Sequence, residues 1–168
     1  MARLKPTEQS TTTAGGPSSK AVDGNTNSKY AFSSCTHTMA TDDTASHWWQ
    51  VDLGGMHQIG DVHIYNRADC CSERLRNVTV QFSLDGVRYS NVTSWSTSGF
   101  TSSSSYLLVI VRPKYFIAPA RYVKIVKSPP NEGLTMCEVQ IYEGHYVNWQ
   151  LTFSGVPLIC EWKVCLFG

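Results

Sequence analysis

The chain has 168 residues, of which 42% are hydrophobic and 16% are charged, and its formal net charge is +1 at pH 7. A chain of this length and hydrophobicity fits one domain with a single sizeable core. The near-zero charge gives no concentrated basic surface for nucleic acid or anionic lipid, and no apolar run approaches the roughly 20 residues of a membrane span. We therefore expect neither nucleic acid as a partner nor membrane insertion.

Short runs with alternating apolar and polar residues predict β-strands, and no sustained helical periodicity appears. The runs expected to form strands are 48–53 (WWQVDL), 59–69 (IGDVHIYNRAD), 78–84 (VTVQFSL), 121–126 (RYVKIV) and 137–143 (CEVQIYE). In the 78–84 run the apolar residues extend from Val78 to Leu84, and Asp85-Gly86 then turns the chain. Many short strands joined by turn-rich loops predict an all-β fold, a β-sandwich or barrel.

In the run 59–69, side chains are expected to alternate between the two faces of the strand as far as the polar residues at its end. Val62 and Ile64 lie on one face, whereas Arg67 and Asp69, two residues apart, emerge together on the other face near the predicted end of the strand. The adjacent cysteines that follow are expected to begin a loop.

Two segments differ in composition from the strand runs. Residues 20–34 (KAVDGNTNSKYAFSS) are rich in turn formers and side-chain oxygens. From His145 the chain becomes aromatic and holds the last two cysteines, which indicates either an extra strand pair or an extension outside the core domain. We divide the chain into a domain at 1–144 and a C-terminal extension of unknown role at 145–168.

Cysteines and glycosylation sequons favour an oxidising, extracellular setting. The six cysteines form an even set without C-x-x-C metal spacing, and the sequence alone does not choose among their pairings. Sequons begin at Asn77 (Asn-Val-Thr) and at Asn91 (Asn-Val-Thr). The N-terminus lacks the apolar stretch of a signal peptide, so we interpret the chain as a mature, secreted form with an added Met.

Residues 66–75 (NRADCCSERL) place two adjacent cysteines between arginines. A Cys70–Cys71 bond would close a small ring with a flat, apolar, sulfur-bearing surface. The forked donors of Arg67 and Arg74 could bind oxygens, and Asp69 could orient them. A sugar, with its C–H face and directional hydroxyls, suits such a site. Other outcomes stay open, because each thiol could pair elsewhere or remain free, and the arginines could be ordinary surface charges.

The order of motifs from about residue 3 to 143 resembles that of the F-type lectins, or fucolectins. The motifs that carry the resemblance are a His within SSCTH (His37), then RADCCSER at 67–74, together with AVDGN (21–25), WWQVDL (48–53), RYV (121–123) and CEV (137–139). Ala68 stands where the family has Gly, which is compatible with the motif if the backbone there keeps φ below zero.

The resemblance implies a discoidin-like β-sandwich, or jelly roll, that binds L-fucose and fucosylated glycans. In the family, the His and the two arginines donate to the sugar and the disulfide between adjacent cysteines packs on it. The positions that match these roles are His37, Arg67 and Arg74 as donors, Asp69 as the orienting carboxylate, and Cys70–Cys71 as the apolar surface. Without the resemblance, His37 would be interpreted as a loop histidine with a local hydrogen bond.

A second group of oxygen-bearing residues is suitable for calcium, which takes roughly six to eight oxygens. Side-chain candidates are Asp23, Asn25, Ser34 and Glu138, although Asp23-Gly24-Asn25 could also be only a turn. The resemblance adds the backbone carbonyls of Lys20 and Cys137 and implies a Cys35–Cys137 disulfide that ties the Ser34 loop to the Glu138 strand. The remaining cysteines, Cys160 and Cys165, are expected to bond to each other or to remain free.

The sequence thus predicts a secreted, calcium-stabilised lectin for terminal L-fucose, acting in innate recognition or agglutination, and not an enzyme. Weak single-site binding makes a homo-oligomer an expected partner state. The alternative is a discoidin-like adhesion module that binds lipid or protein and carries exposed apolar side chains at its loop tips. A hydrolase that uses Cys35 and His37 is disfavoured, because Cys35 is better employed in a disulfide.

Overall fold

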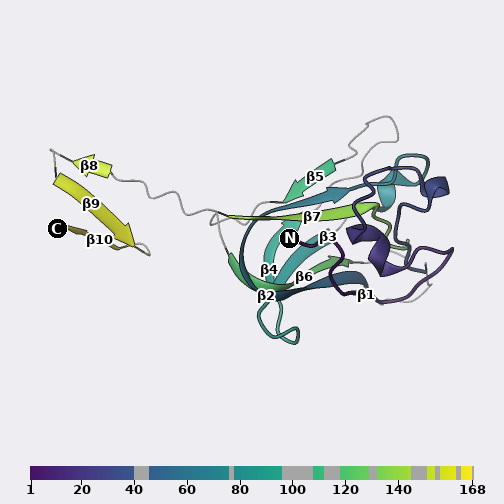
Figure 1. The fold of residues 1–168 in the computed structure, drawn as a ribbon, viewed down its shortest axis with the longest axis horizontal. Helices are drawn as coiled ribbons and strands as arrows, with labels where there is room; N and C mark the ends of the chain where they lie inside the picture. The colour runs from purple at the N-terminus through teal and green to yellow at the C-terminus, as the bar shows by residue number, and fades with distance from the viewer. Residues whose placement is uncertain are drawn as a thin grey trace.

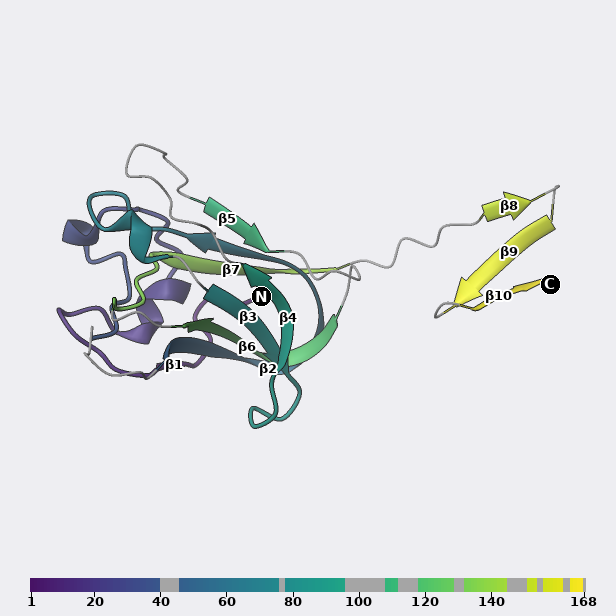
Figure 2. The same ribbon diagram turned by 180° about the vertical axis from the view of Figure 1, so that it is seen from behind.

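The computed structural model describes residues 1–39, 46–75, 78–95, 108–111, 118–128, 132–144, 151–153, 156–161 and 164–167, of which 92–95, 108–111, 118 and 151–167 are described by their backbone alone. Within these ranges the chain forms antiparallel strands and three short 3-10 helices (Figures 1 and 2). The all-β prediction is confirmed. None of the helices in the described residues has the length and hydrophobicity that crossing a membrane requires.

The strands of the larger sheet are β1 (Thr7–Gln9), β2 (His47–Tyr65), β3 (Val78–Ser83), β4 (Ser90–Trp95), β5 (Leu108–Val111), β6 (Ala118–Lys127) and β7 (Glu138–Glu143). The helices are η1 (Ser18–Val22), η2 (Tyr30–Phe32) and η3 (Ser72–Arg74). A second sheet contains β8 (Leu151–Phe153), β9 (Val156–Glu161) and β10 (Val164–Phe167).

Strand β2 belongs to both layers of a sandwich. It is 19 residues long and joins the predicted runs 48–53 and 59–65 into one element. Its first half pairs with β6 and its second half with β5 and β7, and the register shifts between Asp52 and His57, where Gly54 has a φ of +81°. One layer is therefore β1-β2-β6-β3-β4, and the other is β5-β2-β7 (Figure 1).

Two predicted strand ends are wrong, in both cases because side chains turn the backbone earlier. Strand β2 ends at Tyr65, and the Asn66 side chain then accepts the Arg67 N–H at 2.8 Å and donates to the Ser72 carbonyl at 2.9 Å. Strand β3 ends at Ser83, whose hydroxyl accepts the Gly86 N–H at 2.9 Å. Leu84, the last apolar residue of the predicted run, consequently lies outside the strand and is 53% exposed. Arg67 and Asp69 consequently lie in a loop rather than on a strand.

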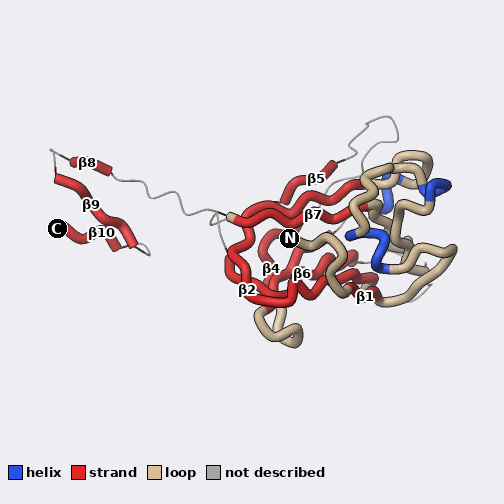
Figure 3. Tube along the Cα trace, viewed as in Figure 1, coloured by secondary structure: helices blue, strands red, loops and turns tan. Residues whose placement is uncertain are grey.

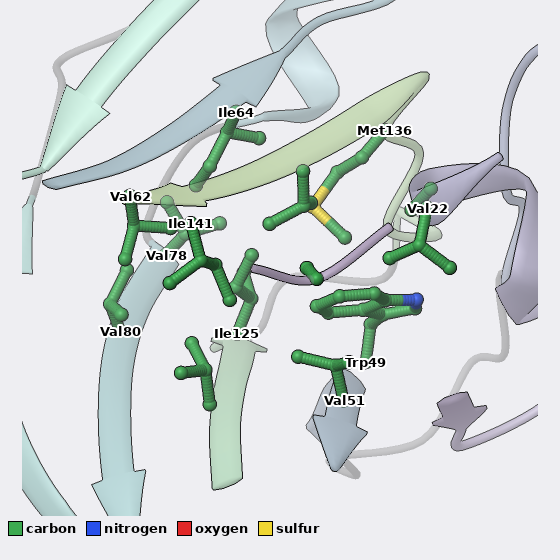
Figure 4. Packing of buried hydrophobic residues seen from close by; sticks show 14 of the residues in the cluster. Val22, Trp49, Val51, Val62, Ile64, Val78, Val80, Ile125, Met136 and Ile141 are labelled. Atoms are coloured by element: carbon green, nitrogen blue, oxygen red, sulfur yellow. The ribbon is translucent and has the colours of Figure 1, made fainter. Parts of the chain in front are cut away.

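The hydrophobic core fills the space between the two layers (Figure 4). Its members alternate along the strands as predicted; among them are Val51, Val62, Ile64, Val78, Val80, Ile125 and Ile141. Trp49 is fully buried and donates its indole N–H to the Ser18 carbonyl at 2.9 Å, which attaches η1 to the core. Burial of each such side chain stabilises the fold by about 1.5–3 kcal/mol. The sandwich therefore holds the loops at its end on a stable core.

The C-terminal strands form their own sheet in the order β10-β9-β8. The register places Cys165 directly opposite Cys160. The strand pair expected in this segment is thus present with a third strand, whereas the bonding of the two thiols lies outside the described residues. The domain boundary at 144 and the role of the extension remain predictions.

Candidate functional site

Apart from Glu138, which begins β7, the site residues singled out in the sequence come from loops and 3-10 helices gathered at one end of the sandwich (Figure 3). A disulfide joins Cys35 to Cys137 at the start of β7, as the resemblance implied. Beside it, Thr36 donates its N–H to the Met136 carbonyl at 2.7 Å. The segment that carries His37 is therefore fixed to the core. Because Cys35 is bonded, it is not a free thiol, and the hydrolase interpretation is wrong.

Arg67 and Asp69 form an ion pair in the loop after β2. The guanidinium Nε donates to Asp69 Oδ1 at 2.6 Å. The same carboxylate accepts the backbone N–H groups of Tyr30 and Cys70, each at 3.1 Å. These hydrogen bonds, the one from Arg67 first, hold the pKa of Asp69 below its usual value. Asp69 thus orients Arg67, as predicted.

The structure pairs Cys70 with Cys71. Cys70 is exposed and Cys71 is half-buried, so part of the disulfide ring faces solvent. Cys71 has a φ of 60°, in the left-handed region that non-glycine residues rarely adopt, and η3 begins directly after it. Ala68 is not among the positive-φ residues, which fulfils the condition for replacing the family's glycine.

Arg74 and His37 meet across the site, with 3.2 Å between Arg74 Nη1 and His37 Nε2. A guanidinium nitrogen can only donate, so Nε2 of the neutral ring accepts and the ring proton resides on Nδ1. Burial, followed by repulsion from Arg74 and Arg67, lowers the pKa of His37 below its usual 6.5. The imidazole is therefore neutral at physiological pH.

Tyr30 is a residue of this site that the sequence did not reveal. Arg67 Cζ lies 4.5 Å from the centre of the Tyr30 ring, and the His37 ring meets it edge-on at 5.6 Å. The Tyr30 hydroxyl donates to the Ala14 carbonyl at 2.7 Å. No local spacing could have signalled this role, because the partners of Tyr30 lie in three separate loops.

The predicted metal-binding cluster is centred on Glu138, which is 2% exposed. Its carboxylate accepts the Gly24 N–H at 3.3 Å and forms no ion pair within the described part of the chain. Burial raises the pKa of Glu138 to about 7; the negative charge of Asp23 reinforces this shift, and the Gly24 hydrogen bond and the positive charge of Arg3 partly offset it. A buried carboxylate with an acidic neighbour is a suitable ligand for a divalent cation.

The other predicted ligands make local contacts. Asp23 Oδ1 accepts the Asn25 N–H at 2.9 Å, so the turn interpretation of this segment also holds. Ser34 donates its hydroxyl to the Lys29 carbonyl at 2.9 Å, and the Lys20 ammonium lies 3.9 Å from Asp23. The described residues contain no group of three His, Cys, Asp or Glu side chains suited to a metal. A site here would therefore depend on backbone carbonyls, as predicted for Lys20 and Cys137.

Comparisons with known proteins agree with this architecture. A family model described as "NedA-like, galactose-binding domain" matches residues 20–125. Fucolectin of Anguilla anguilla is 34% identical over 136 residues, covering 76% of this chain and 77% of that protein. Fucolectin-4 of Anguilla japonica is 33% identical over 125 residues, covering 73% of this chain but only 65% of its own length, which is less than two thirds.

Solved structures extend the likeness to the fold. The lectin domain of lectinolysin, complexed with Lewis B antigen, has a TM-score of 0.71 and 35% identity, covering 84% of this chain and 94% of that one. A fucose-binding module of Streptococcus pneumoniae has a TM-score of 0.71 and 32% identity, with coverages of 84% and 93%. The family model, the sequence identity and the shared discoidin-like fold together show that this chain belongs to the F-type lectin, or fucolectin, family.

Proposed function

We propose that this protein is a lectin that binds terminal L-fucose on fucosylated glycans. The observation that carries the proposal is the convergence of His37, Arg67 and Arg74 beside the Cys70–Cys71 disulfide. Its relatives point the same way, since they are named as fucolectins or as fucose-binding modules. Relatives of this kind are carbohydrate-binding proteins without catalytic activity, and the same is proposed here.

The chemistry of the site fits a neutral sugar. Each guanidinium has five N–H donors, and Asp69 occupies two of those of Arg67 at 2.6 and 3.5 Å, which leaves the others for sugar hydroxyls. The neutral ring of His37 can exchange its contact with Arg74 for one with a hydroxyl. The disulfide supplies an apolar surface for the C–H face of the sugar. Because these groups are already hydrogen-bonded in place, little ordering is needed on binding.

We further propose that Ca²⁺ stabilises the fold at the cluster around Glu138. The carboxylates of Glu138 and Asp23, the side-chain oxygens of Asn25 and Ser34, and the carbonyls of Lys20 and Cys137 are the proposed ligands. The support is the buried, acid-flanked Glu138 carboxylate. A bound cation would supply the positive charge that this carboxylate needs to remain ionised in the core.

The second candidate is a discoidin-like adhesion module that binds lipid or protein. Such a module is expected to carry exposed apolar side chains in its loops, and two residues near the site fit this expectation. Phe32 is 61% exposed and Met39 is 45% exposed. The nearby cluster of cationic and hydrogen-bonding groups favours the sugar. A vesicle co-sedimentation assay with wild type and Phe32→Ala distinguishes the two, since a lectin should not sediment with vesicles that lack glycolipid.

Secretion, a role in innate recognition or agglutination, and assembly into a homo-oligomer complete the proposal. They are supported by the extracellular character of the cysteines and sequons and by the need for avidity when a single site binds weakly. Agglutination of fucosylated cells requires at least two sites per particle. Analytical ultracentrifugation therefore accompanies the agglutination assay.

The proposed function is tested by a glycan array and by calorimetric titration with L-fucose. The matched control is Arg88→Ala, which removes an exposed arginine from the turn after β3. Selective binding to fucosylated glycans, retained in the control and lost in Arg67→Ala, supports the assignment. No binding of fucose by wild type in the presence of calcium would refute it.

A further inference from the structure

Lys127, the last residue of β6, has a side chain that is 0% exposed. An ammonium in a protein core is costly unless its charge and its N–H donors are matched. The Lys127 Nζ donates to the backbone carbonyl of Arg74 at 2.7 Å and lies 3.9 Å from Glu132 Oε2. The ammonium of Lys127 therefore contacts two segments of the chain, and one of them carries Arg74, a proposed sugar donor.

The first segment is η3, which ends at Arg74. The last carbonyls of a helix have no partner within the helix, and a cation is favourable there. The Arg74 backbone itself donates to the Cys71 carbonyl at 3.1 Å. Lys127 thus holds the end of η3 through its hydrogen bond to the Arg74 carbonyl. The guanidinium of the same residue extends to His37.

The second segment begins at Glu132 and runs beside the loop of His37. Leu134 donates its N–H to Thr38 Oγ1 at 2.7 Å, and Thr38 donates its N–H to the Leu134 carbonyl at 3.0 Å. A Cβ added to Gly133 would meet the Thr38 carbonyl oxygen, so the two segments are in close contact there. Lys127 therefore links the segment that supports His37 to the helix that carries Arg74.

We propose that Lys127 is a positioning residue for sugar binding, whose buried ammonium joins the Arg74 carbonyl to Glu132 and so keeps the Arg74 guanidinium beside His37. The inference rests on the proposed function, because the sugar is the ligand that this pair would bind. It assigns a role to a residue that touches no sugar and that lies just past the predicted strand 121–126. A merely structural lysine would contribute to folding without changing the Arg74–His37 pair.

The test is Lys127→Met, which keeps most of the side-chain volume and removes the charge. The matched control is Lys124→Met on the outward face of the same strand, where the ammonium lies 4.3 Å from the centre of the Trp48 ring. Two readouts are needed. The first is the pKa of His37 in the sugar-free protein, measured by NMR titration, and the second is the affinity for L-fucose, measured by calorimetry.

If Arg74 loses its position in Lys127→Met, its repulsion of His37 weakens, so the pKa of His37 should rise toward 6.5 and fucose affinity should fall about tenfold. The control should match wild type in both. A folded Lys127→Met protein with an unchanged His37 pKa and unchanged affinity would overturn the proposal. If wild type binds no fucose, the proposed function fails, while the His37 pKa still decides whether Lys127 positions Arg74.

Should Lys127→Met not fold, Glu132→Gln replaces it, because Glu132 is partly exposed and its loss leaves the buried ammonium with less compensation. The expected result is a smaller rise of the His37 pKa in the same direction. An unchanged His37 pKa in Glu132→Gln would then refute the link.

Discussion

Replacing Glu138 by Gln should abolish the stabilisation of the fold by calcium and should remove the cost of a buried negative charge. In the folded protein the pKa of Glu138 is raised from 4.5 to about 7. The folded state therefore binds more protons than the unfolded state between these values, and stability falls as the pH rises through this window. At 1.36 kcal/mol per pKa unit, the ionised carboxylate costs about 3 kcal/mol at pH 8 in the absence of a cation.

This cost sets the difference in unfolding free energy that we expect when a chelator removes calcium. Between pH 6 and pH 8, wild type should lose about 1 kcal/mol of unfolding free energy, whereas Glu138→Gln should lose none from this group. At pH 8 the variant should be more stable than wild type by up to about 3 kcal/mol. Gln keeps an oxygen that can accept the Gly24 N–H, so the comparison isolates the charge.

With calcium at about a thousandfold excess over its Kd, the order should invert. A ligand that binds only the folded state adds about 4.1 kcal/mol at this excess, which exceeds the cost of the ionised carboxylate. Wild type should gain this stabilisation and Glu138→Gln should not. The gain should increase from pH 6 to pH 8, because below about pH 7 the cation must displace a proton from Glu138.

The assay is urea unfolding at pH 6 and pH 8, in chelator and in millimolar calcium. Glu143→Gln, at the exposed end of the same strand, is the control and should behave as wild type. Equal stability of wild type in chelator and calcium at both pH values, with no difference from Glu138→Gln, would refute the calcium site and the argument from burial.

The remaining predictions concern the sugar site. Arg74→Ala should weaken L-fucose binding roughly ten- to hundredfold in calorimetry, and Lys at this position should not restore it, because an ammonium lacks the planar fork; wild-type affinity in either variant would contradict this. Replacing Cys70 and Cys71 together by Ser should weaken binding less, by about 1 kcal/mol, and a larger loss than that of Arg74→Ala would reject a merely apolar role. Fucose affinity should be constant above pH 6.5 and fall only below it, because the pKa of His37 is lowered and a protonated ring would repel the arginines; a transition above pH 6.5 would contradict this. Deleting the residues after 144 should leave fucose affinity intact, and a folded truncation that does not bind would make the extension part of the site.

Some of this protein could be predicted from the sequence because the physical signal is local. The pleat of a strand imposes an alternation with a period of two. The burial of Val78, Val80 and Phe82 can therefore be predicted from the sequence pattern without knowing which residues they pack against. Two adjacent cysteines can meet wherever the chain goes. The ion pair of Arg67 with Asp69 likewise needs a separation of only two residues, and it forms although the predicted strand ends earlier.

What only the tertiary structure decides is which distant residues come together. Tyr30 lies against Arg67 and His37 because separate loops converge at one end of the sandwich. Lys127 has the sequence character of a solvated strand end, yet its ammonium is buried under η3. The sequence marks Glu138 as a candidate calcium ligand, but only the fold buries its carboxylate and so raises its pKa to about 7. Charge, burial and long-range contact are properties of the whole fold, because each depends on the atoms that surround a side chain rather than on its neighbours in sequence.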